Sequence, residues 1–266
     1  MVTLKEALKN KLKETPSSFD VIGNIAIFSK LLDDLKKQKL IANTLLKLNK
    51  NIKTILLKTK KFSGKYRLPK YKVIAGKKTK EALYKENNSI FKLNLEKCYF
   101  SSRLANERLR IAKQVKFNET ILVMFSGIAI YPIVIARNSK AKEIYAIEIN
   151  PVAHKYALEN LMLNKINNIK LFKGDVKKIL PKIKLKFDRI IMPAPKNAEL
   201  YLNLIKNKIK KGTIVHFYGF SQEKDFPKGT INKIKKYFKK IKILKALKCG
   251  AYSPYVYRVC IDFQVL

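Results

Sequence analysis

The amino-acid sequence predicts an α/β protein in which a domain with a parallel sheet follows a small α+β domain. Two observations carry this prediction. After residue 101, strand-like runs alternate with helical stretches, whereas before it short helices and β-rich segments mix. The 266 residues are 47% hydrophobic and 29% charged, which is enough apolar material to bury a core. We therefore expect a first domain over 1–98 and a second over 99–266.

The first domain is expected to mix helices and strands. Residues 1–15 are studded with lysine and lack the apolar centre of a signal peptide, so they predict an amphipathic helix. An alternating segment covers Val21–Phe28, a helix lies near Leu40–Leu48, and a β-rich run extends over 52–93. Within that run, Glu86-Asn87-Asn88 supplies the turn chemistry of a hairpin.

The second domain begins with a helix from Ser101, because Leu104, Ile111, Ala112 and Val115 share one face. Alternation of strands with helices then predicts a parallel sheet, and the last two strands are separated by the loop over 250–254. The expected strands cover 121–125, 144–149, 169–172, 189–192, 213–218, 240–247 and 256–266.

The charge balance indicates a polyanionic partner. With 58 Lys and Arg against 19 Asp and Glu, the formal charge is 58 − 19 = +39, and acids are too scarce for the ion-pair networks of heat-adapted proteins. RNA or DNA is the expected partner. The three cysteines lack metal-ligand spacing, which argues against a zinc site or disulfide framework and fits a reducing cytoplasm. The longest uncharged stretch, Ile121–Ala136, is too short to span a membrane.

A nucleoside site is predicted at the carboxyl ends of the first strands, where open parallel sheets bind ligands. Phe125-Ser126-Gly127 follows the first strand, and Glu148 ends the second, 21 residues after Gly127, a spacing typical of a carboxylate that holds ribose hydroxyls. A single glycine disfavours a pyrophosphate, so S-adenosylmethionine is the expected cofactor. Asp175 after the third strand is expected to face the adenine amino group, with Ile149 and Val176 beside it. The alternatives are a solvated carboxylate at Glu148 and an ordinary turn residue at Asp175.

Four segments carry a resemblance that extends over nearly the whole chain. They are Phe19-Asp20-Val21-Ile22-Gly23-Asn24-Ile25-Ala26, the specific run Tyr99-Phe100-Ser101-Ser102-Arg103-Leu104-Ala105-Asn106-Glu107-Arg108-Leu109-Arg110-Ile111, Ile147-Glu148-Ile149-Asn150-Pro151 and Val215-His216-Phe217-Tyr218. The chain resembles the archaeal tRNA guanine-37 N1-methyltransferases and their wyosine-pathway relatives. The resemblance implies a class I, Rossmann-like S-adenosylmethionine-dependent methyltransferase domain, acting without a metal on a purine of the tRNA anticodon loop.

The resemblance also implies roles for individual residues. Glu107 matches the family's proposed general base, Arg67 an arginine that contacts the target base, and Arg103 an arginine at the entrance of the catalytic domain, beside the cofactor. A carboxylate suits guanine N1, whose weakly acidic proton must leave for methyl transfer. The alternatives are a helix-surface ion pair of Glu107 with Arg103 or Arg110, a backbone-phosphate contact at Arg67, and a structural ion pair at Arg103.

Aromatic and basic side chains complete the predicted substrate site. Tyr99, Tyr218 or Tyr252 could stack on an everted base, although an aromatic beside a sheet is more often part of the core. His216 is expected to be a packed strand residue. Lysines of the first domain and of the tract over 233–245 are expected to neutralise tRNA phosphates. The sequence leaves the oligomeric state open.

Departures from the family pattern widen the expected substrate range. Val123 stands where the family has an aspartate, and Ala129 and Ile130 replace a Gly-Pro pair. Pro193 replaces an asparagine at the start of the loop that carries Pro195 and Lys196. We assign Pro193 and Pro195 to the catalytic site and Lys196 to the substrate site. The main expectation is methylation of guanosine 37 on N1, or of 4-demethylwyosine on carbon 7. The alternatives are an aminocarboxypropyl transferase and a non-catalytic tRNA-binding protein.

Overall fold

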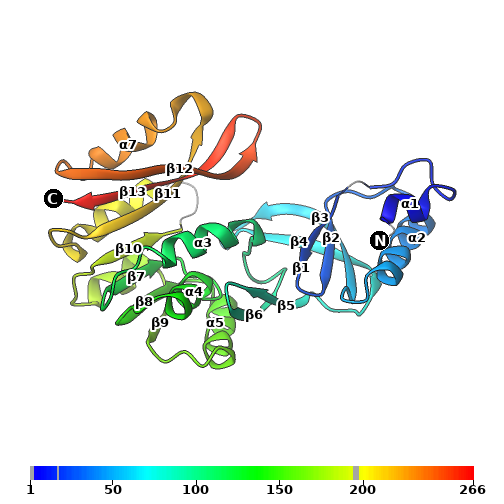
Figure 1. Ribbon diagram of the computed structural model, residues 1–266, viewed down its shortest axis with the longest axis horizontal. Coiled ribbons are helices and arrows are strands. Elements are labelled where there is room, and N and C mark those ends of the chain that lie inside the picture. Colours follow the sequence, from blue (N-terminus) through cyan, green and yellow to red (C-terminus); the bar gives the residue numbers. More distant parts are fainter. Residues whose placement is uncertain (1–2, 17, 194–197) are drawn as a thin grey trace. The chain divides into compact units, whose positions relative to one another are not determined.

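The computed structural model describes residues 3–16, 18–193 and 198–266, and its backbone forms two compact units. The first unit comprises the chain up to Lys85 together with Ile90–Phe100, and the second comprises Glu86–Ser89 together with Ser101–Leu266 (Figure 1). In the described part of the chain, no helix is both long and apolar enough to cross a bilayer.

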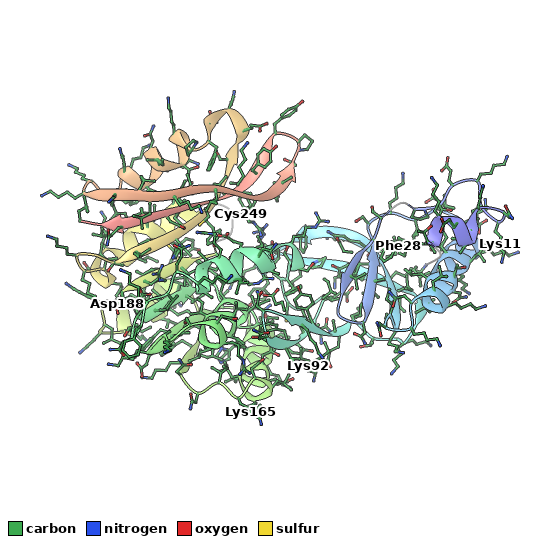
Figure 2. All side chains as sticks on the ribbon, viewed as in Figure 1. Lys11, Phe28, Lys92, Lys165, Asp188 and Cys249 are labelled. Carbon is green, nitrogen blue, oxygen red and sulfur yellow. The ribbon has the colours of Figure 1, made fainter. Side chains whose placement is uncertain are left out.

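The first unit is built on a four-stranded sheet in the order β1-β2-β3-β4. Only the β2–β3 pair is parallel. Leu8 of one helix and Ile41 and Leu45 of the other are buried against Phe28, a residue labelled in Figure 2. The elements are α1 (Leu4–Leu8), β1 (Asp20–Ile22), β2 (Ile25–Phe28), α2 (Leu35–Leu48), β3 (Thr54–Ser63) and β4 (Leu68–Gly76).

Three expectations for the first unit were wrong in detail. The segment Val21–Phe28 is not one alternating strand, because it turns at Gly23, whose φ is +57°, and all four residues of β2 are buried. A Cβ at Gly23 would lie 2.0 Å from the Leu83 carbonyl oxygen, so the position requires glycine. The amino-terminal helix ends at Leu8, while α2 begins earlier than predicted because the Asp34 side chain caps it.

The predicted hairpin is confirmed as β5 (Glu81–Glu86) and β6 (Ser89–Asn94). Asn87 and Asn88 have φ of 46° and 60°, a left-handed conformation that asparagine tolerates in tight hairpin turns. The Asn87 side-chain amide donates to the Ala105 carbonyl at 2.9 Å, and Glu86 pairs with Arg108, which is 2% exposed. These contacts fix the start of the helix that carries Glu107.

The second unit contains a seven-stranded sheet in the order β12-β13-β11-β10-β7-β8-β9. The strands from β11 to β9 are parallel, and β13 enters antiparallel between β11 and β12, so the predicted parallel sheet is mixed at one edge. The strands are β7 (Thr120–Met124), β8 (Glu143–Glu148), β9 (Ile169–Lys173), β10 (Arg189–Met192), β11 (Ile214–Gln222), β12 (Ile241–Ser253) and β13 (Val256–Val265).

Helical segments connect these strands (Figure 1). The predicted helix after Ser101 is divided into a short 3-10 turn and α3, and Val115 lies beyond its end. Tyr252, predicted in a loop, lies in β12. The segments are η1 (Ser102–Leu104), α3 (Ala105–Ala112), α4 (Ile130–Asn138), α5 (Pro151–Leu163), α6 (Val176–Ile179), η2 (Leu180–Lys182), η3 (Ala198–Lys208), η4 (Glu223–Asp225) and α7 (Lys228–Lys235).

The two faces of the sheet differ in chemistry because side chains alternate along each strand. On one face, Val215, Phe217, Ile261 and Phe263 join an apolar core with residues of η3 and α7. The intervening residues of β11 and β13 point to the other face, and several are polar, namely His216, Tyr218, Cys260 and Asp262. A buried polar layer therefore lies between this part of the sheet and α3.

Candidate active site

The carboxyl ends of β7, β8 and β9 are tied together by the backbone. The N–H of Ser126 donates to the Ile147 carbonyl at 3.0 Å, and the N–H of Gly174 donates to the Glu148 carbonyl at 2.8 Å. The three strand ends thus meet at one edge of the sheet, where parallel α/β sheets bind ligands. The predicted cofactor residues after these strands are brought together.

The loop after β7 has a strained backbone and open space in front of it. Phe125, Gly127 and Ala129 have φ of 54°, 58° and 63°. A Cβ at Gly127 would have no atom within 4 Å, so a ligand can approach the backbone there. The buried Ser126 hydroxyl has no hydrogen-bond partner among the described residues. Such an orphaned polar atom beside an open backbone fits a site that a polar ligand completes.

Glu148 is held at this loop by backbone donors. One carboxylate oxygen accepts from the Gly127 N–H and the other from the Asn150 N–H, both at 2.7 Å. Burial raises the pKa of Glu148, and these hydrogen bonds oppose that shift. The side chain is 8% exposed, so the alternative of a solvated strand-end carboxylate was wrong. Each oxygen retains acceptor capacity, as a pair of ribose hydroxyls requires.

The other predicted cofactor residues have distinct positions. Asp175 caps α6 by accepting from the Lys177 N–H at 2.9 Å and is half-buried. Ile149 is half-buried and Val176 is buried in the core. The Phe125 ring meets the Tyr201 ring edge-on at 4.8 Å. The residues present fit a nucleoside, with Glu148 suited to the ribose and Asp175 suited to an amino group.

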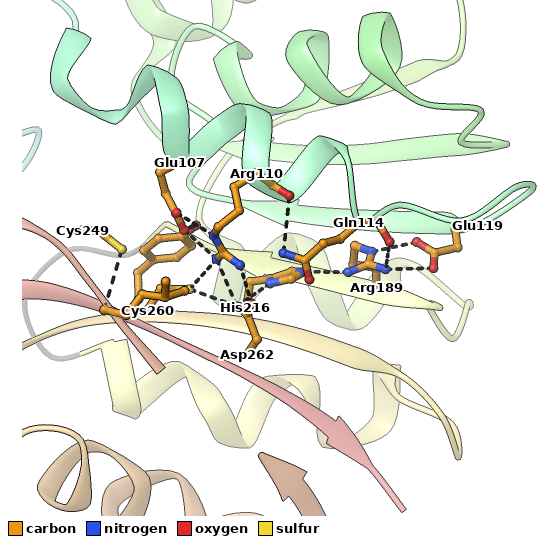
Figure 3. A network of polar contacts seen from close by, with 11 residues as sticks. Glu107, Arg110, Gln114, Glu119, Arg189, His216, Cys249, Cys260 and Asp262 are labelled. Carbon is orange, nitrogen blue, oxygen red and sulfur yellow. Dashed lines mark hydrogen bonds and ion pairs between the residues drawn. The ribbon is translucent and has the colours of Figure 1, made fainter. Parts of the chain in front are cut away.

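Glu107 points from α3 toward the sheet (Figure 3). Its Oε2 accepts from Arg110 Nε at 2.7 Å, and its Oε1 accepts from Arg110 Nη2 at 2.7 Å and from the Tyr218 hydroxyl. The predicted ion pair with Arg110 is therefore present. A carboxylate offers about four acceptor positions, and among the described residues Oε2 uses one of its two. One position remains for an N–H donor such as that of a purine.

The contacts of Glu107 continue into a buried network (Figure 3). Arg110 also pairs with Asp262, whose Oδ1 lies 2.7 Å from His216 Nδ1. His216 Nε2 lies 2.7 Å from Arg189 Nη1, and Arg189 forms a fork with Glu119 at 2.7 and 3.0 Å. Each of the three carboxylates in the network contacts one of its two guanidinium groups.

Hydrogen-bond donors determine the protonation states in this network. Arginine can only donate, so His216 Nε2 accepts from Arg189 and Nδ1–H donates to Asp262. Burial lowers the pKa of His216, which keeps the imidazole neutral. Burial opposes ionisation of Asp262, but hydrogen bonds from His216 and Arg110 hold its pKa well below the usual range. Burial raises the pKa of Tyr218, so its hydroxyl keeps the proton it donates to Glu107.

His216, Cys260 and Asp262 bring three potential metal-ligand atoms within 4.8 Å of one another. Their surroundings oppose a cation, because both nitrogens of His216 are engaged and the guanidinium groups of Arg110 and Arg189 lie against the cluster. The neutral thiol of Cys260, whose pKa burial raises, is a poor ligand. The arrangement instead orients Glu107.

The remaining predicted site residues are dispersed. In the first unit, the guanidinium of Arg67 lies over the Tyr99 ring at 5.0 Å, so these two predicted substrate residues are paired. In the second unit, Arg103 is exposed in η1, Tyr252 is 48% exposed in β12, and Pro193 follows β10. The predictions for Pro195 and Lys196 lie outside the described residues.

Sequence reasoning missed most of the network around Glu107. Asp262 and Arg189 were not singled out, and His216 is packed as predicted but also links them. Tyr218 is 2% exposed and bonded to Glu107, so its role as a stacking residue was wrong. The available signal was the alternation of polar with apolar residues in Val215-His216-Phe217-Tyr218 and Val259-Cys260-Ile261-Asp262, which marks a polar sheet face.

The strand order, the loop after β7 and the acid that ends β8 define a Rossmann-like domain of the methyltransferase class. The comparison with known proteins specifies the family. The chain belongs to the TRM5/TYW2 methyltransferase family, because the model of the TRM5/TYW2 methyltransferase domain matches residues 82–245 and that of the TYW2 N-terminal domain matches residues 3–79.

Three curated relatives illustrate the similarity. The tRNA (guanine(37)-N(1))-methyltransferase Trm5b of Pyrococcus abyssi is 37% identical over 94% of this chain and 75% of its own length. The tRNA (guanine(37)-N(1))/4-demethylwyosine(37)-methyltransferase Taw22 of Nanoarchaeum equitans is 37% identical over 78% of this chain and 85% of its own. The tRNA(Phe) (4-demethylwyosine(37)-C(7)) aminocarboxypropyltransferase of Methanocaldococcus jannaschii is 32% identical over 92% and 96%.

Solved structures agree with this family. The complex of aTrm5 with tRNALeu has a TM-score of 0.86 and 27% identity, and the match covers 100% of this chain and 78% of that one. M. jannaschii TYW2 in complex with AdoMet has a TM-score of 0.71 and 27% identity, with coverage of 94% and 100%. Both similarities extend through the two units of this chain.

Proposed function

We propose that the chain transfers a methyl group from S-adenosylmethionine to N1 of guanosine at position 37 of tRNA. The observation that carries this proposal is the Glu107 carboxylate, which an arginine fork holds in place while one acceptor position remains on Oε2. The activities of relatives such as Trm5b of Pyrococcus abyssi support the same substrate and position.

The loop after β7 is the proposed cofactor site. Glu148 would accept hydrogen bonds from the ribose hydroxyls, the Ser126 hydroxyl would gain a partner, and the open backbone at Gly127 would allow close approach. Asp175 and Ile149 border the adenine. Bound S-adenosylmethionine supplies an electrophilic methyl group and a neutral thioether leaving group. The AdoMet complex of TYW2 from M. jannaschii supports this assignment.

Proton removal is the step that Glu107 performs. Guanine N1–H donates to Oε2 of Glu107, and the carboxylate takes up the proton, which leaves N1 with a lone pair that could accept the methyl group. Arg110 and Tyr218 hold the carboxylate so that its acceptor position does not rotate away. Alignment of N1 with the methyl donor supplies the remaining rate enhancement.

The surface charge supports tRNA as the macromolecular partner. The formal charge is +39, and lysines such as Lys11 and Lys165 project outward from the two units (Figure 2). The tRNALeu complex of aTrm5 agrees with this partner. In a loop, the target purine can be splayed out without breaking a duplex, and Arg67 and Tyr99 are the proposed contacts of the first unit to the tRNA. Cys98, Cys249 and Cys260 form no disulfide among the described residues, which fits the reducing cytoplasm as the proposed compartment.

Mass spectrometry of nucleosides from treated tRNA tests the proposal. Wild-type protein, S-adenosylmethionine and unmodified tRNA are expected to yield 1-methylguanosine, whereas tRNA with adenosine at position 37 is expected to remain unmodified. Absence of any methylated guanosine, with cofactor and tRNA binding verified by calorimetry, contradicts the assignment.

Pro193 favours a second candidate substrate. A proline there offers neither a side-chain amide nor an N–H, so fewer donors and acceptors read the edge of guanine. Such a site can admit the tricyclic 4-demethylwyosine, on which the M. jannaschii relative acts. Incubation of tRNA carrying that base separates the possibilities, because methyl and aminocarboxypropyl products differ in mass.

A further inference from the structure

A ribbon of three strands extends past the carboxyl edge of the parallel sheet. β10 pairs with β11 only as far as Phe217, but β11 continues to Gln222, paired with β13 down to Val256. β12 accompanies β13 to Ser253. The ribbon therefore projects from the edge at which the cofactor loop lies, and its first residue beyond β10 is Tyr218, the partner of Glu107.

One face of this ribbon carries aromatic rings and a guanidinium group. Phe220 lies directly opposite Arg258, whose guanidinium is 5.6 Å from the ring centroid. The Tyr252 ring packs against Phe220 with centroids 4.6 Å apart. Because side chains alternate, Phe220 shares the face of Tyr218, and Arg258 shares that of Cys260. The polar layer around Glu107 thus continues on this face as an aromatic and cationic surface.

The tip of the ribbon holds a tyrosine in an unfavourable backbone conformation. Ser253 pairs with Val256, so Pro254 and Tyr255 form a two-residue connection. Tyr255 has a φ of 56°, a position where such turns prefer glycine or asparagine. Its side chain is 78% exposed, so burial does not compensate for the strain. Strain of this kind is retained mainly where a side chain has a function.

The charge of the ribbon selects an anionic partner. The segment over 241–261 contains no aspartate or glutamate. Lys248 and Arg258 lie in the projecting part, Lys248 paired with Glu223, and Lys242 and Lys245 lie where β12 runs alongside the sheet. Exposed aromatic rings between cations are the composition of surfaces on which unpaired bases stack while cations neutralise the backbone. Unpaired bases and phosphates of the proposed tRNA substrate account for both the rings and the positive charge, so we favour single-stranded nucleic acid.

We propose that Phe220, Tyr252, Tyr255 and Arg258, here called the aromatic tip, form a stacking platform for an unpaired nucleotide of the RNA substrate. The inference rests on the proposed function and specifies how the substrate is recognised outside the reacting base. Tyr252 and Tyr255 present their rings to the base, Phe220 supports the Tyr252 ring, and Arg258, which lies over Phe220, supplies positive charge beside the rings. Such a platform selects an unpaired loop over a duplex.

Binding of two RNA probes tests the aromatic tip. The probes are a stem-loop with the anticodon-loop sequence and a fully paired RNA duplex with the same number of phosphates, and fluorescence anisotropy measures the Kd. The variants are Tyr252→Ala, Tyr255→Gly and Tyr257→Ala. Tyr257 neighbours Arg258 in β13 and faces the opposite side of the ribbon, so it is the matched control for loss of a ring.

The stacking role predicts a selective loss. Tyr252→Ala and Tyr255→Gly are expected to weaken stem-loop binding by about 5- to 150-fold each, with duplex binding unchanged. Tyr257→Ala is expected to leave both affinities unchanged. Tyr255→Gly relieves the left-handed strain, so this variant is expected to unfold at a temperature no lower than wild type, which excludes misfolding as the cause.

Two results would overturn the inference. Equal weakening for stem-loop and duplex would indicate a phosphate contact without stacking, and unchanged stem-loop affinity in both tip variants would assign the exposed rings to another partner. Product analysis keeps this test separate from the proposed function, because wild-type protein either forms the methylated nucleoside or does not, whatever the tip contributes to binding.

Discussion

Replacement of Glu107 by glutamine separates its role as a base from its role in the buried network. Glutamine has the same shape but no charge, and one oxygen becomes an amide that donates. If the remaining carbonyl takes the position of Oε1, it still accepts from Arg110 Nη2 and Tyr218. The amide nitrogen then takes the place of Oε2, which lies 2.7 Å from Arg110 Nε, so two hydrogen-bond donors face each other.

The expected magnitudes follow from these contacts. Loss of one charge-assisted hydrogen bond at a side chain that is 10% exposed reduces the free energy of unfolding by about 1.5–3 kcal/mol. Arg110 retains Asp262, so the network persists. Loss of the proton acceptor reduces the methyl-transfer rate by about 10²–10⁴-fold. We expect Glu107→Gln to fold and to bind cofactor and tRNA, but to methylate tRNA very slowly.

Single-turnover kinetics with saturating enzyme measure the chemical step, and calorimetry measures cofactor binding. Tyr218→Phe is the matched control, because it removes one donor to Glu107 while the carboxylate remains, and we expect a smaller rate loss from it. A single-turnover rate for Glu107→Gln within about threefold of wild type would refute the base role, since general-base catalysis contributes far more than that.

Three further predictions follow from the structure. Asp262→Ala is expected to lower the free energy of unfolding by about 3–5 kcal/mol, because it leaves Arg110 and His216 without their buried partner, and denaturant titration measures the difference. Because the fold lowers the pKa of Asp262, its ionised carboxylate stabilises the fold fully at pH values above about 3.9, its pKa in the unfolded chain. This stabilisation declines as the pH falls further, so the difference in free energy of unfolding between wild type and Asp262→Ala is expected to become smaller in acid. A difference that does not change with pH contradicts this prediction. Gly23→Ala is expected to destabilise the first unit by at least about 2 kcal/mol, through left-handed strain and the clash with the Leu83 carbonyl. Limited proteolysis measures the effect, and cleavage of the variant no faster than wild type would contradict the prediction. Glu148→Gln is expected to weaken S-adenosylmethionine binding by about tenfold or more in calorimetry, while Glu159→Gln, at a half-buried position of α5, leaves it unchanged; equal affinities of the Glu148 variant and wild type would remove Glu148 from the ribose contact.

Sequence periodicity predicted the sheet of the second unit well because its strands are short apolar runs separated by helices. It failed at Val21–Phe28, where the turn depends on the close approach of Leu83, a contact that no local pattern records. It also placed Tyr252 in a loop, because Gly250 and Pro254 resemble loop residues although the strand pairs through a bulge. A tertiary contact overrode local propensity in the first case, and pairing of β12 with the following strand β13 did so in the second.

Similar reasoning explains what was and was not predicted at the site. Glu148 and Gly127 could be found because the carboxyl edge of a parallel sheet is a general binding position and their spacing is local. The pair of Arg110 with Asp262 joins residues 152 positions apart, so no local sequence pattern links them. The resemblance indicated Glu107, but the structure explains what holds it.

Arginine and lysine occupy different kinds of position in this protein. Among 58 basic residues only seven are arginine, so the other 51 are lysine. Five of the seven occupy positions that need a planar fork or a flat cation: Arg108, Arg110 and Arg189 pair with buried carboxylates, and Arg67 and Arg258 lie over aromatic rings.

Lysine could not replace these groups, because its ammonium is a strongly hydrated point charge that neither forms a two-point fork nor stacks. Several of the scarce acids are committed to the buried arginines, which leaves most surface lysines without a carboxylate to balance them. The pairing of acids with arginines therefore orients Glu107 inside the domain, and the unbalanced lysines maintain a positive field at the surface that attracts RNA.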